Sequence, residues 1–348
     1  MHGINLKRVT IIGQGLAGSV LAFSLYKRGV QVRIVDNNWK NAASKVAAGM
    51  WNPVNFRRMI PGWRVEDLLP SMLKFFSELE SELDVKLLHQ KHLIRRIPDE
   101  ASRKLWKNQE EKLQKYSDLK ASLAEADAMN WPNGYGIIPS CGVLDIPLFL
   151  EKTKRFFINQ DAYCMGEFSW NEPLPDDELI ISCEGYATRN NPYFNWVPIG
   201  ANHGEILEIK DPQNWNSSNI LNCGKFLFKA PNGVWKAGSV YVPENEQLTP
   251  IDGAADEIKE PIEKALKERL SINNITVGIR PTSKDRAPVM GFHPETKNIG
   301  IFGGLGTKGV LNAPFFAEQF SEHICNGKEI DREVAIDRFL KKHYDKKN

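Results

Sequence analysis

The sequence contains no long hydrophobic run. No apolar stretch approaches the roughly 20 residues that a helix needs to cross a bilayer. The first apolar stretch, residues 9–12, is interrupted at once by Gly13, Gln14 and Gly15, and no signal-peptide cleavage pattern follows it. We therefore expect a cytoplasmic protein with neither a membrane span nor a secretion signal.

The sequence also lacks an excess of charge of either sign. Its 45 Lys and Arg residues nearly balance its 43 Asp and Glu residues, which leaves a formal charge of +2. Proteins that bind nucleic acids usually carry a concentrated positive charge. We therefore expect no nucleic-acid partner.

Cysteine is scarce and follows no metal-binding spacing. Disulfide frameworks and zinc sites both require an ordered spacing of cysteines, which is missing here. The five cysteines are odd in number and widely scattered, at Cys141, Cys164, Cys183, Cys223 and Cys325. We therefore expect reduced thiols and no metal centre.

The N-terminal residues show a β-α-β pattern. Residues 9–12 are short and apolar, as in a strand that is buried on both faces of a parallel sheet. A helix is expected over residues 19–28, and a second strand over residues 30–35 leads into Asp36. The turn between the first strand and the helix contains three glycines, Gly13, Gly15 and Gly18.

Helical and strand-like patterns continue along the chain. We expect helices over residues 70–83, 100–124, 147–157, 254–270 and 313–324, and strands over residues 93–97, 134–138 and 179–183. The first of these helices is expected to bury one stripe, formed by Leu69, Leu73, Phe76, Leu79 and Leu83. Residues 37–54 are rich in small residues and predict an extended loop, whereas the alternating residues 204–242 predict a β-rich region.

The length and the position of the glycines indicate two domains. A chain of 348 residues, of which 42% are hydrophobic, is long enough for both. Glycine-rich segments at both ends of the sequence indicate one nucleotide-binding domain that is interrupted by a β-rich insertion. We predict an α/β (mixed α+β) protein with a Rossmann-like domain formed by residues 1–85, 140–195 and 278–348, and a β-rich substrate domain formed by residues 86–139 and 196–277.

The glycines of the first turn form a dinucleotide fingerprint. The first permits a tight turn, the second lets the backbone approach a pyrophosphate, and the third lets the helix pack closely on the sheet. The helix N-terminus offers free N–H groups to phosphates. Asp36, about 20 residues further on, is placed to accept hydrogen bonds from a ribose diol. The fingerprint predicts a bound dinucleotide but does not separate FAD from NAD.

Other segments resemble the D-amino-acid oxidase-like flavoproteins, a family that includes glycine oxidase and monomeric sarcosine oxidase. Residues 43–50 resemble the small-residue segment that passes under the flavin, and residues 180–185 resemble the later strand that ends in glycine near FAD. Residues 278–291 resemble the family's G-x-R-P-x-(S/T)-x-D-x-x-P-x-x-G segment, and residues 303–309 follow in the family's order. Taken alone, residues 43–49 would favour a flexible loop, and only the other two segments change that interpretation.

The resemblance implies FAD as the cofactor. It implies that FAD is held noncovalently, because Arg280, Pro281 and Thr282 occupy the site where covalent members carry the attaching cysteine. The same resemblance and the fingerprint together place the following residues at the cofactor: Gly13, Gly15, Leu16, Ala17, Gly18, Asp36, Asn37, Ser44, Lys45, Ala47, Ala48, Gly49, Met50, Gly185, Gly304, Leu305, Gly306, Thr307, Lys308 and Gly309. Lys308 would equally suit a solvated loop.

The resemblance implies a catalytic or substrate-contacting role for two cations. Arg280 matches the arginine that grips the substrate carboxylate with two parallel hydrogen bonds, and the alternative for it is an internal ion pair. Lys236 resembles the lysine that faces the flavin N5 edge in sarcosine oxidase-like members, and the alternative is an exposed lysine on an alternating strand. A lysine at that edge would favour an oxidase over a dehydrogenase.

Further residues are candidates for the substrate pocket. They are Trp51, Arg57, Phe226 and Tyr241. Phe226 stands where glycine oxidase carries a substrate-binding tyrosine, so that family's amino-acid clamp is incomplete in this sequence.

The leading hypothesis is an FAD-dependent oxidoreductase that oxidises a small primary or secondary amine, an amino acid or a derivative, to an imine by hydride transfer to flavin N5. Oxygen or another acceptor would then reoxidise the flavin. Two alternatives stay open: oxidation of a modified wobble uridine in tRNA, because residues 304–314 also resemble that group of flavoproteins, and a flavin-binding redox protein without turnover. Neither the substrate, the electron acceptor nor the oligomeric state follows from the sequence.

Overall fold

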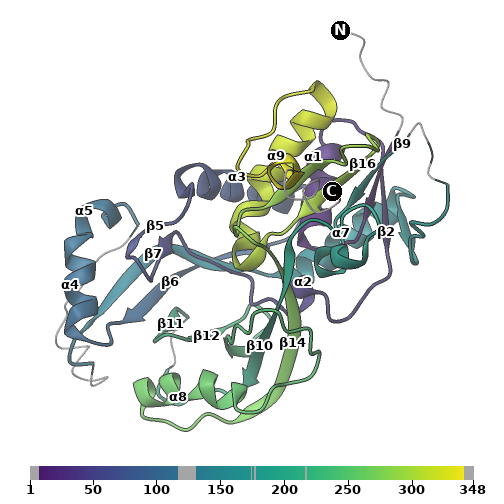
Figure 1. Cartoon of the computed structure of the whole chain (residues 1–348). Helices are drawn as coiled ribbons and strands as arrows, with labels where there is room; N and C mark the ends of the chain where they lie inside the picture. The colour runs from purple at the N-terminus through teal and green to yellow at the C-terminus, as the bar shows by residue number, and fades with distance from the viewer. Residues whose placement is uncertain (1–7, 117–130, 174, 176–177, 216–217, 341–348) are drawn as a thin grey trace.

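The protein folds around two β-sheets. The structure is a computed structural model that describes residues 8–116, 131–173, 175, 178–215 and 218–340 (Figure 1). The first sheet has six strands in the order β15-β16-β9-β1-β2-β8. Its strands are β1 (Arg8–Ile12), β2 (Val32–Asp36), β8 (Tyr163–Met165), β9 (Glu178–Ser182), β15 (Val289–Phe292) and β16 (Ile299–Gly303). All neighbours are parallel except β15 and β16.

The predicted β-α-β unit is confirmed at the centre of this sheet. The apolar strand β1 lies between β2 and β9, and Val9 and Ile11 are fully buried. Helix α1 (Leu16–Tyr26) is also buried over most of its length, and it begins directly after Gly15, three residues before the predicted start. The helix packs against α9 (Gly309–Asn326) and α7 (Ile146–Asn159).

The second sheet forms the β-rich part of the molecule. Its eight strands have the order β14-β10-β13-β12-β11-β6-β7-β3. They are β3 (Met50–Trp51), β6 (Leu88–Arg96), β7 (Tyr135–Leu144), β10 (Ile199–Ile209), β11 (Ile220–Asn222), β12 (Phe226–Lys229), β13 (Trp235–Gly238) and β14 (Ile272–Ser283). Helix α8 (Ala254–Leu266) covers one face, where its Ile258 and Ile262 pack with Leu207 and Leu227 (Figure 1).

Helices α3, α8 and α9 differ from the predicted helices in where they begin or end. Helix α3 (Val65–Leu83) begins five residues before Pro70, and its buried stripe follows that earlier start. Met72 and Phe75 are buried in it, whereas Leu73 is 44% exposed, so the prediction for Leu73 is wrong. Helix α9 likewise begins before the predicted residue 313, and α8 ends at Leu266 because Lys267 adopts the left-handed conformation, with φ of 52°.

The predicted helix over residues 100–124 and the predicted loop over residues 37–54 are both wrong in part. The first divides into α4 (Glu100–Asn108) and α5 (Glu110–Leu113), and its last residues lie outside the described part of the chain. The second contains the short helix α2 (Ala43–Val46), followed by β3. After β3 comes a hairpin formed by β4 (Val54–Asn55) and β5 (Ile60–Pro61).

The remaining short elements are the 3-10 turns η1 (Gly185–Asn190), η2 (Gly306–Lys308) and η3 (Ile336–Phe339). Strands β7 and β14 each run across a predicted domain boundary, so the exact boundaries stay predictions. No helix among the described residues is long and apolar enough to cross a membrane. All five cysteines are unpaired, and the described residues contain no group of three or more His, Cys, Asp and Glu suited to a metal ion.

Candidate cofactor and substrate site

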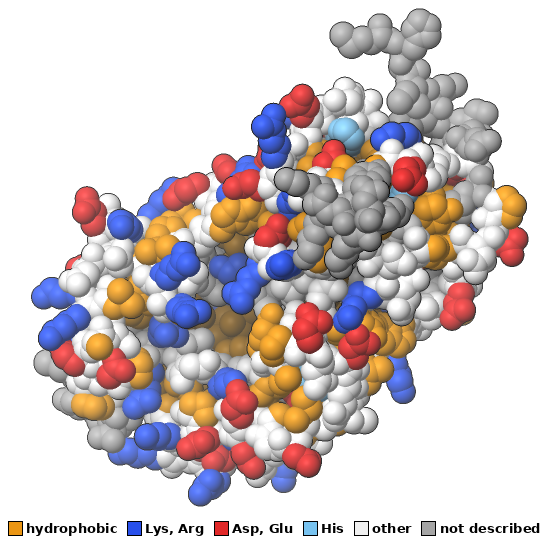
Figure 2. All heavy atoms as spheres, viewed as in Figure 1, with side chains coloured by type: hydrophobic (Ala, Val, Ile, Leu, Met, Phe, Trp, Pro, Cys, Tyr) orange, Lys and Arg blue, Asp and Glu red, His pale blue; other side chains and the backbone are white. Residues whose placement is uncertain are grey.

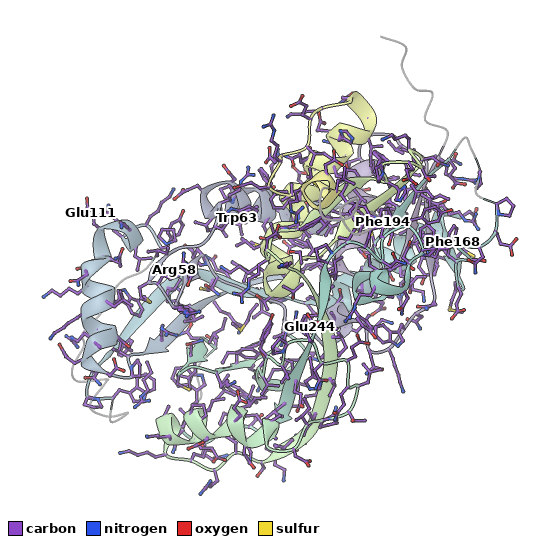
Figure 3. All side chains as sticks on the ribbon, viewed as in Figure 1. Arg58, Trp63, Glu111, Phe168, Phe194 and Glu244 are labelled. Atoms are coloured by element: carbon purple, nitrogen blue, oxygen red, sulfur yellow. The ribbon has the colours of Figure 1, made fainter. Side chains whose placement is uncertain are left out.

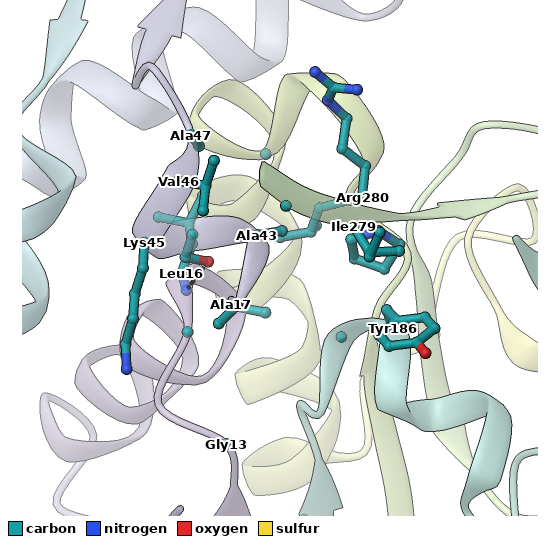
Figure 4. A pocket seen from close by; sticks show the side chains of 18 of the residues that line it. Gly13, Leu16, Ala17, Ala43, Lys45, Val46, Ala47, Tyr186, Ile279 and Arg280 are labelled. Carbon is teal, nitrogen blue, oxygen red and sulfur yellow. Dashed lines mark hydrogen bonds between the residues drawn. The ribbon is translucent and has the colours of Figure 1, made fainter. Parts of the chain in front are cut away.

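A cavity of about 740 Å³ lies between the two sheets. One part is formed at the carboxyl ends of β1, β2 and β9, the usual ligand position in open α/β sheets. The opposite part is formed by the face of the second sheet that α8 does not cover. In Figure 4, Gly13, Leu16 and Lys45 lie on one side of the cavity, and Arg280 of the second sheet and Tyr186, from the turn after β9, lie on the other.

The glycines of the fingerprint have distinct steric roles. Gly13 has a φ of 99°, and a Cβ there would lie 2.8 Å from the backbone oxygen of Cys183. Gly13, Gly15, Leu16 and Ala17 line the cavity. Gly18 does not line the cavity. A Cβ there would lie 2.0 Å from the backbone oxygen of Gly13. Its role is close packing of the helix on the turn.

Asp36 ends β2 at the edge of the cavity, beside Asn37. Its Oδ1 accepts a 2.9 Å hydrogen bond from the Gln14 backbone N–H, and its Oδ2 accepts one of the same length from the Asn38 N–H. These bonds fix the carboxylate. Each carboxylate oxygen can accept more than one hydrogen bond, so the group can still receive hydroxyl donors from a ribose.

The segment after Asp36 passes along the cavity. Its predicted contact residues all line the cavity: Ser44, Lys45, Ala47, Ala48, Gly49 and Met50. Ser44 Oγ accepts a 2.9 Å hydrogen bond from the Leu16 N–H, which ties this segment to the start of α1. Burial lowers the pKa of Lys45, whose Nζ donates to Asn38 Oδ1 at 2.8 Å. The predicted extended loop is therefore an ordered wall of the cavity.

The C-terminal glycine loop forms another wall. Gly185, Gly304, Leu305, Gly306, Thr307, Lys308 and Gly309 all line the cavity. Gly304 and Gly306 have φ angles of 65° and 57°, which favour glycine. Helix α9 begins at Gly309, so the N-termini of both α1 and α9 reach the cavity. Lys308 is half-buried, and burial lowers its pKa.

Arg280 lies on β14, in register with Asn202 of β10, and it lines the cavity. Its Nη1 donates to the backbone oxygens of His203 at 3.2 Å and Val240 at 3.1 Å. Its guanidinium lies against Gly204, where a Cβ would be 2.1 Å from Nη1. Among the described residues, no carboxylate pairs with Arg280, so the alternative of an internal ion pair is not found there. Burial lowers the pKa of Arg280.

Only one of the other residues predicted for catalysis or the substrate pocket lies at the cavity. Phe226 lines the cavity, whereas Lys236, Trp51, Arg57 and Tyr241 do not. Tyr241 is 43% exposed, although its ring centre lies 5.9 Å from Arg280 Cζ. Trp51 is buried, and Arg57 is exposed on the hairpin.

Lys236 lies one row away from the cavity on the second sheet. Phe226, Gly238 and Ile206 form one row across β12, β13 and β10, whereas Lys236 belongs to the next row, with Glu208 and Phe228. The lysine is partly buried, and this burial lowers its pKa despite the opposing charges of Glu208 and Asp145.

Several cavity residues escape prediction from the sequence. Trp39 and Tyr186 both line the cavity, and their rings stack with centres 5.9 Å apart. Glu184 also lines it and accepts hydrogen bonds from Ser182, Asn191 and Trp170. Only one feature of the sequence could have indicated two of them: Glu184 and Tyr186 are the neighbours of Gly185, which was predicted to contact the cofactor. Only the tertiary structure brings Trp39 to Tyr186.

The residues of the cavity fit an extended dinucleotide with a flat ring system. Two helix N-termini supply N–H groups for phosphates, and Asp36 lies beside one of them. The two walls formed by residues 43–50 and 303–309 are rich in small residues, which allow the backbone to lie close to a flat ring. Thr282 Oγ1 is buried without a hydrogen-bond partner among the described residues and lies next to Gly306, where a polar ligand atom would satisfy it.

Comparison with curated proteins finds distant relatives. The chain is 23% identical over 362 residues to the bifunctional tRNA 5-methylaminomethyl-2-thiouridine biosynthesis protein MnmC of Idiomarina loihiensis, covering 95% of this chain and 58% of that protein. The corresponding protein of Leptospira interrogans serogroup Icterohaemorrhagiae serovar copenhageni is 21% identical, with 97% and 60% covered. The chain therefore spans about three fifths of the length of these relatives.

Comparison with solved structures finds the same fold. Glycine oxidase from Bacillus cereus ATCC 14579 superposes with a TM-score of 0.75 at 18% identity, covering 93% of this chain and 96% of that one. Iminodiacetate oxidase from Chelativorans sp. BNC1 gives a TM-score of 0.76 at 19% identity, with 95% and 98% covered. At such identities the likeness establishes the fold alone.

A family model matches the N-terminal part of the chain. Residues 8–161 match the family described as FAD dependent oxidoreductase. This range contains the fingerprint, Asp36 and the wall formed by residues 43–50. The chain is therefore similar to this family over somewhat less than half of its length, in the part that holds the first walls of the cavity.

Proposed function

We propose that this protein oxidises a primary or secondary amine, an amino acid or a derivative of one, with FAD as the cofactor. The observation that carries the proposal is Arg280, a cation in the cavity wall without a carboxylate partner among the described residues. The carboxylate of an amino acid would supply the missing counter-charge.

The geometry of Arg280 suits a fixed carboxylate receptor. Two backbone carbonyls hold its Nη1, and the flat contact with Gly204 fixes the plane of the guanidinium. The Nε and Nη2 N–H groups make no hydrogen bond within the described residues, so they remain for a ligand. A guanidinium held in this way loses little further freedom when it binds a carboxylate.

The fingerprint, Asp36, residues 43–50 and the loop of residues 303–309 would hold FAD, without a covalent bond. When bound, FAD supplies the acceptor for the hydride that leaves the substrate. Phe226 and Ile206 would limit the access of water from the side of the second sheet. Arg280 and Lys308 would disfavour the ammonium form of a bound substrate, because like charges lower the pKa of an amine. The neutral amine is the form that gives up a hydride.

The experiment is an anaerobic absorbance titration of the FAD-loaded protein with glycine, sarcosine, proline and a panel of D-amino acids. Bleaching of the flavin absorbance by one of them would support amine oxidation and identify the substrate class. Flavin that stays oxidised with every member of the panel would exclude simple amino acids and favour a larger amine or a protein without turnover. Absence of a flavin spectrum after incubation with FAD would refute the cofactor.

A second candidate function is oxidation of a modified wobble uridine in tRNA. The observation in its favour is the coverage of 95% and 97% of this chain by the two relatives named for tRNA 5-methylaminomethyl-2-thiouridine biosynthesis. The nearly balanced charge of the chain speaks against it. The same anaerobic titration with tRNA from cells that accumulate the carboxymethylated base distinguishes the two functions.

A further inference from the structure

Arg95 is a second partly buried cation without a carboxylate partner in the described part of the chain. It lies on β6, and its Nη1 donates a 2.6 Å hydrogen bond to Asn222 Oδ1. Its Cζ lies 4.4 Å from the centre of the Phe56 ring. A neutral amide and an aromatic face orient the guanidinium, but neither one neutralises its charge. The Nε and Nη2 groups have no hydrogen-bond acceptor among the described residues.

A guanidinium in this environment is unfavourable unless an anion joins it. Removing a cation from water costs free energy that a counter-charge normally compensates. The effect is visible at Arg95, where burial lowers the pKa. The contrast with Arg28 is clear, because Arg28 pairs with Glu318 and Glu322.

The strand register places Arg95 on the face of the second sheet that borders the cavity. Arg95 is paired with Asn222 of β11, and Asn222 is paired with Phe226 of β12, which lines the cavity. The β4–β5 hairpin extends from the cavity to Arg95. Its base adjoins Asn52, a lining residue, and it carries Phe56 toward Arg95.

Two further arginines lie at the tip of this hairpin. Arg57 and Arg58 are exposed, and within the described residues neither forms an ion pair. Their backbone N–H groups donate to Asn55 Oδ1, which fixes the turn that carries them. Figure 3 shows Arg58 in front of the β6 and β7 strands, and Figure 2 shows Lys and Arg side chains gathered beside a hollow at the same place.

We propose that Arg95, together with Arg57 and Arg58, forms a second anion-binding subsite, which takes an oxyanion of the distal part of the substrate, a phosphate or a carboxylate. The inference rests on the proposed function for its link to the substrate. Arg280 and Arg95 stand on the first and the sixth strand of the sheet order, five strand spacings apart. At about 4.8 Å per spacing, the two backbones lie on the order of 20 Å apart. The substrate is therefore an amine with a second anionic group well beyond its reacting end, and not a free simple amino acid.

The test is a binding measurement on the FAD-loaded protein that requires no turnover. Inorganic pyrophosphate, citrate and a short single-stranded RNA are titrated by calorimetry at low ionic strength. Arg95→Gln removes the charge but keeps a side chain that can reach Asn222. Arg57→Gln/Arg58→Gln changes exposed residues only. The matched control is Arg332→Gln, which removes an exposed arginine without an ion pair in the described residues, on the C-terminal segment.

We expect Arg95→Gln to weaken binding of the small anions at least tenfold, the hairpin variant to weaken it several-fold, and Arg332→Gln to leave it unchanged. Preference for pyrophosphate over citrate would identify a phosphate, and a further gain with RNA would identify a nucleotide chain as its source. Equal binding by all four proteins would overturn the subsite, as would a loss of RNA binding in the hairpin variant alone. Because the flavin spectrum and Tm report folding, a misfolded Arg95→Gln would be recognised, and the hairpin variant would then decide.

The proposed function and this subsite can fail separately. Anion binding that depends on Arg95, without bleaching by any amine, would retain the subsite and refute amine oxidation. If a simple amino acid bleaches the flavin, and if its affinity is the same in the Arg95→Gln variant, amine oxidation would be retained. The proposal that the substrate carries a second anionic group would then be refuted.

Discussion

Single side chains around the cavity are held by backbone groups more than by opposite charges. Arg280 is fixed by two carbonyl oxygens, and Asp36 by two N–H groups. Backbone partners orient these side chains without neutralising them, so each keeps its charge for a ligand. At the residue scale, this arrangement means that loss of the charge should affect binding more than folding.

Replacing Arg280 tests this point directly. We expect Arg280→Gln to weaken the affinity for a carboxylate ligand by roughly 10- to 100-fold, because hydrogen bonds to charged groups contribute about 1.5–3 kcal/mol. The measurement is a titration of the flavin spectrum with benzoate. Arg280→Lys is the matched variant, which keeps the charge but loses the planar fork and should recover only part of the affinity. Unchanged affinity in both variants would contradict the role of Arg280.

Gly18 gives a second test at the residue scale, and it concerns packing. A Cβ at Gly18 would lie 2.0 Å from the backbone oxygen of Gly13, so the helix or the turn must move. We expect Gly18→Ala to cost about 1–3 kcal/mol of folding free energy and to lower the FAD content of the purified protein. The control for the loss of stability is Gly166→Ala, where a Cβ meets no protein atom within 4 Å. Equal Tm values for the two variants would contradict this steric account.

At the scale of elements, a buried pair behind the second sheet supports the loop that holds Arg280. His203 and Glu205 are fully buried, with His203 Nε2 lying 2.9 Å from Glu205 Oε1. His203 Nδ1 lies 2.7 Å from the Gln247 backbone oxygen, and Glu205 Oε1 accepts from the Ile251 N–H at 2.7 Å. These contacts tie the loop after β13 to β10. The same loop supplies the Val240 oxygen that receives Arg280.

Removing the carboxylate of Glu205 should therefore loosen this loop. We expect Glu205→Leu to cost about 2–3 kcal/mol of stability, because it leaves a buried N–H and a buried imidazole without their acceptor. It should also weaken benzoate binding, although Glu205 does not line the cavity. Urea unfolding measures the first effect, and the flavin titration measures the second. A variant with reduced stability but unchanged benzoate affinity would show that the loop does not position Arg280.

The start of α3 is joined to the C-terminal segment by an ion pair with a defined pH dependence. The hydrogen bond from Arg64 lowers the pKa of Asp331 below its ordinary value of 3.8. Because the folded-state pKa is the lower one, the pair stabilises the protein above the unfolded-state pKa, and this stabilisation is lost as the pH falls through the folded-state pKa.

We expect Asp331→Asn to lower the Tm at pH 7 and to have a smaller effect below pH 3. The side chain of Asp331 is 38% exposed, so solvent screening keeps the difference small. Tm measured for both proteins from pH 7 down to about pH 2, through the range in which the carboxylate is protonated, checks this expectation. A Tm difference between the two proteins that grows as the pH falls would contradict it.

At the scale of the whole molecule, the cavity lies between the two sheets and takes its walls from both. A ligand that contacts both sheets stabilises the folded protein as a unit. We expect Tm to rise with FAD concentration, by an amount that corresponds to about 2.7 kcal/mol at a free FAD concentration of 100 times Kd. Differential scanning fluorimetry of the FAD-depleted protein measures this rise. A Tm that does not respond to FAD would contradict a cofactor site between the sheets.

The sequence alone determined the local parts of the site. The order of strand, glycines, helix, second strand and Asp36 is a short-range pattern, because each turn depends on residues close together in the chain. The glycine loop of residues 303–309 was visible for the same reason. The start of α3 was not, because the pattern predicted a helix from residue 70, whereas the helix begins at Val65, and both Val65 and Leu68 are buried.

Only the tertiary structure decided which side chains share the cavity. The sequence made Lys236 a catalytic candidate and Phe226 a candidate for the substrate pocket, but the register of β12 and β13 put Phe226 in the cavity row and Lys236 in the next. Trp39 meets Tyr186, and Arg95 meets Phe56, across long stretches of chain. Strand register depends on contacts between distant segments, and a shift by one residue turns every side chain to the other face. Local patterns therefore predict the cofactor fold, whereas the substrate side follows from how the eight strands pair.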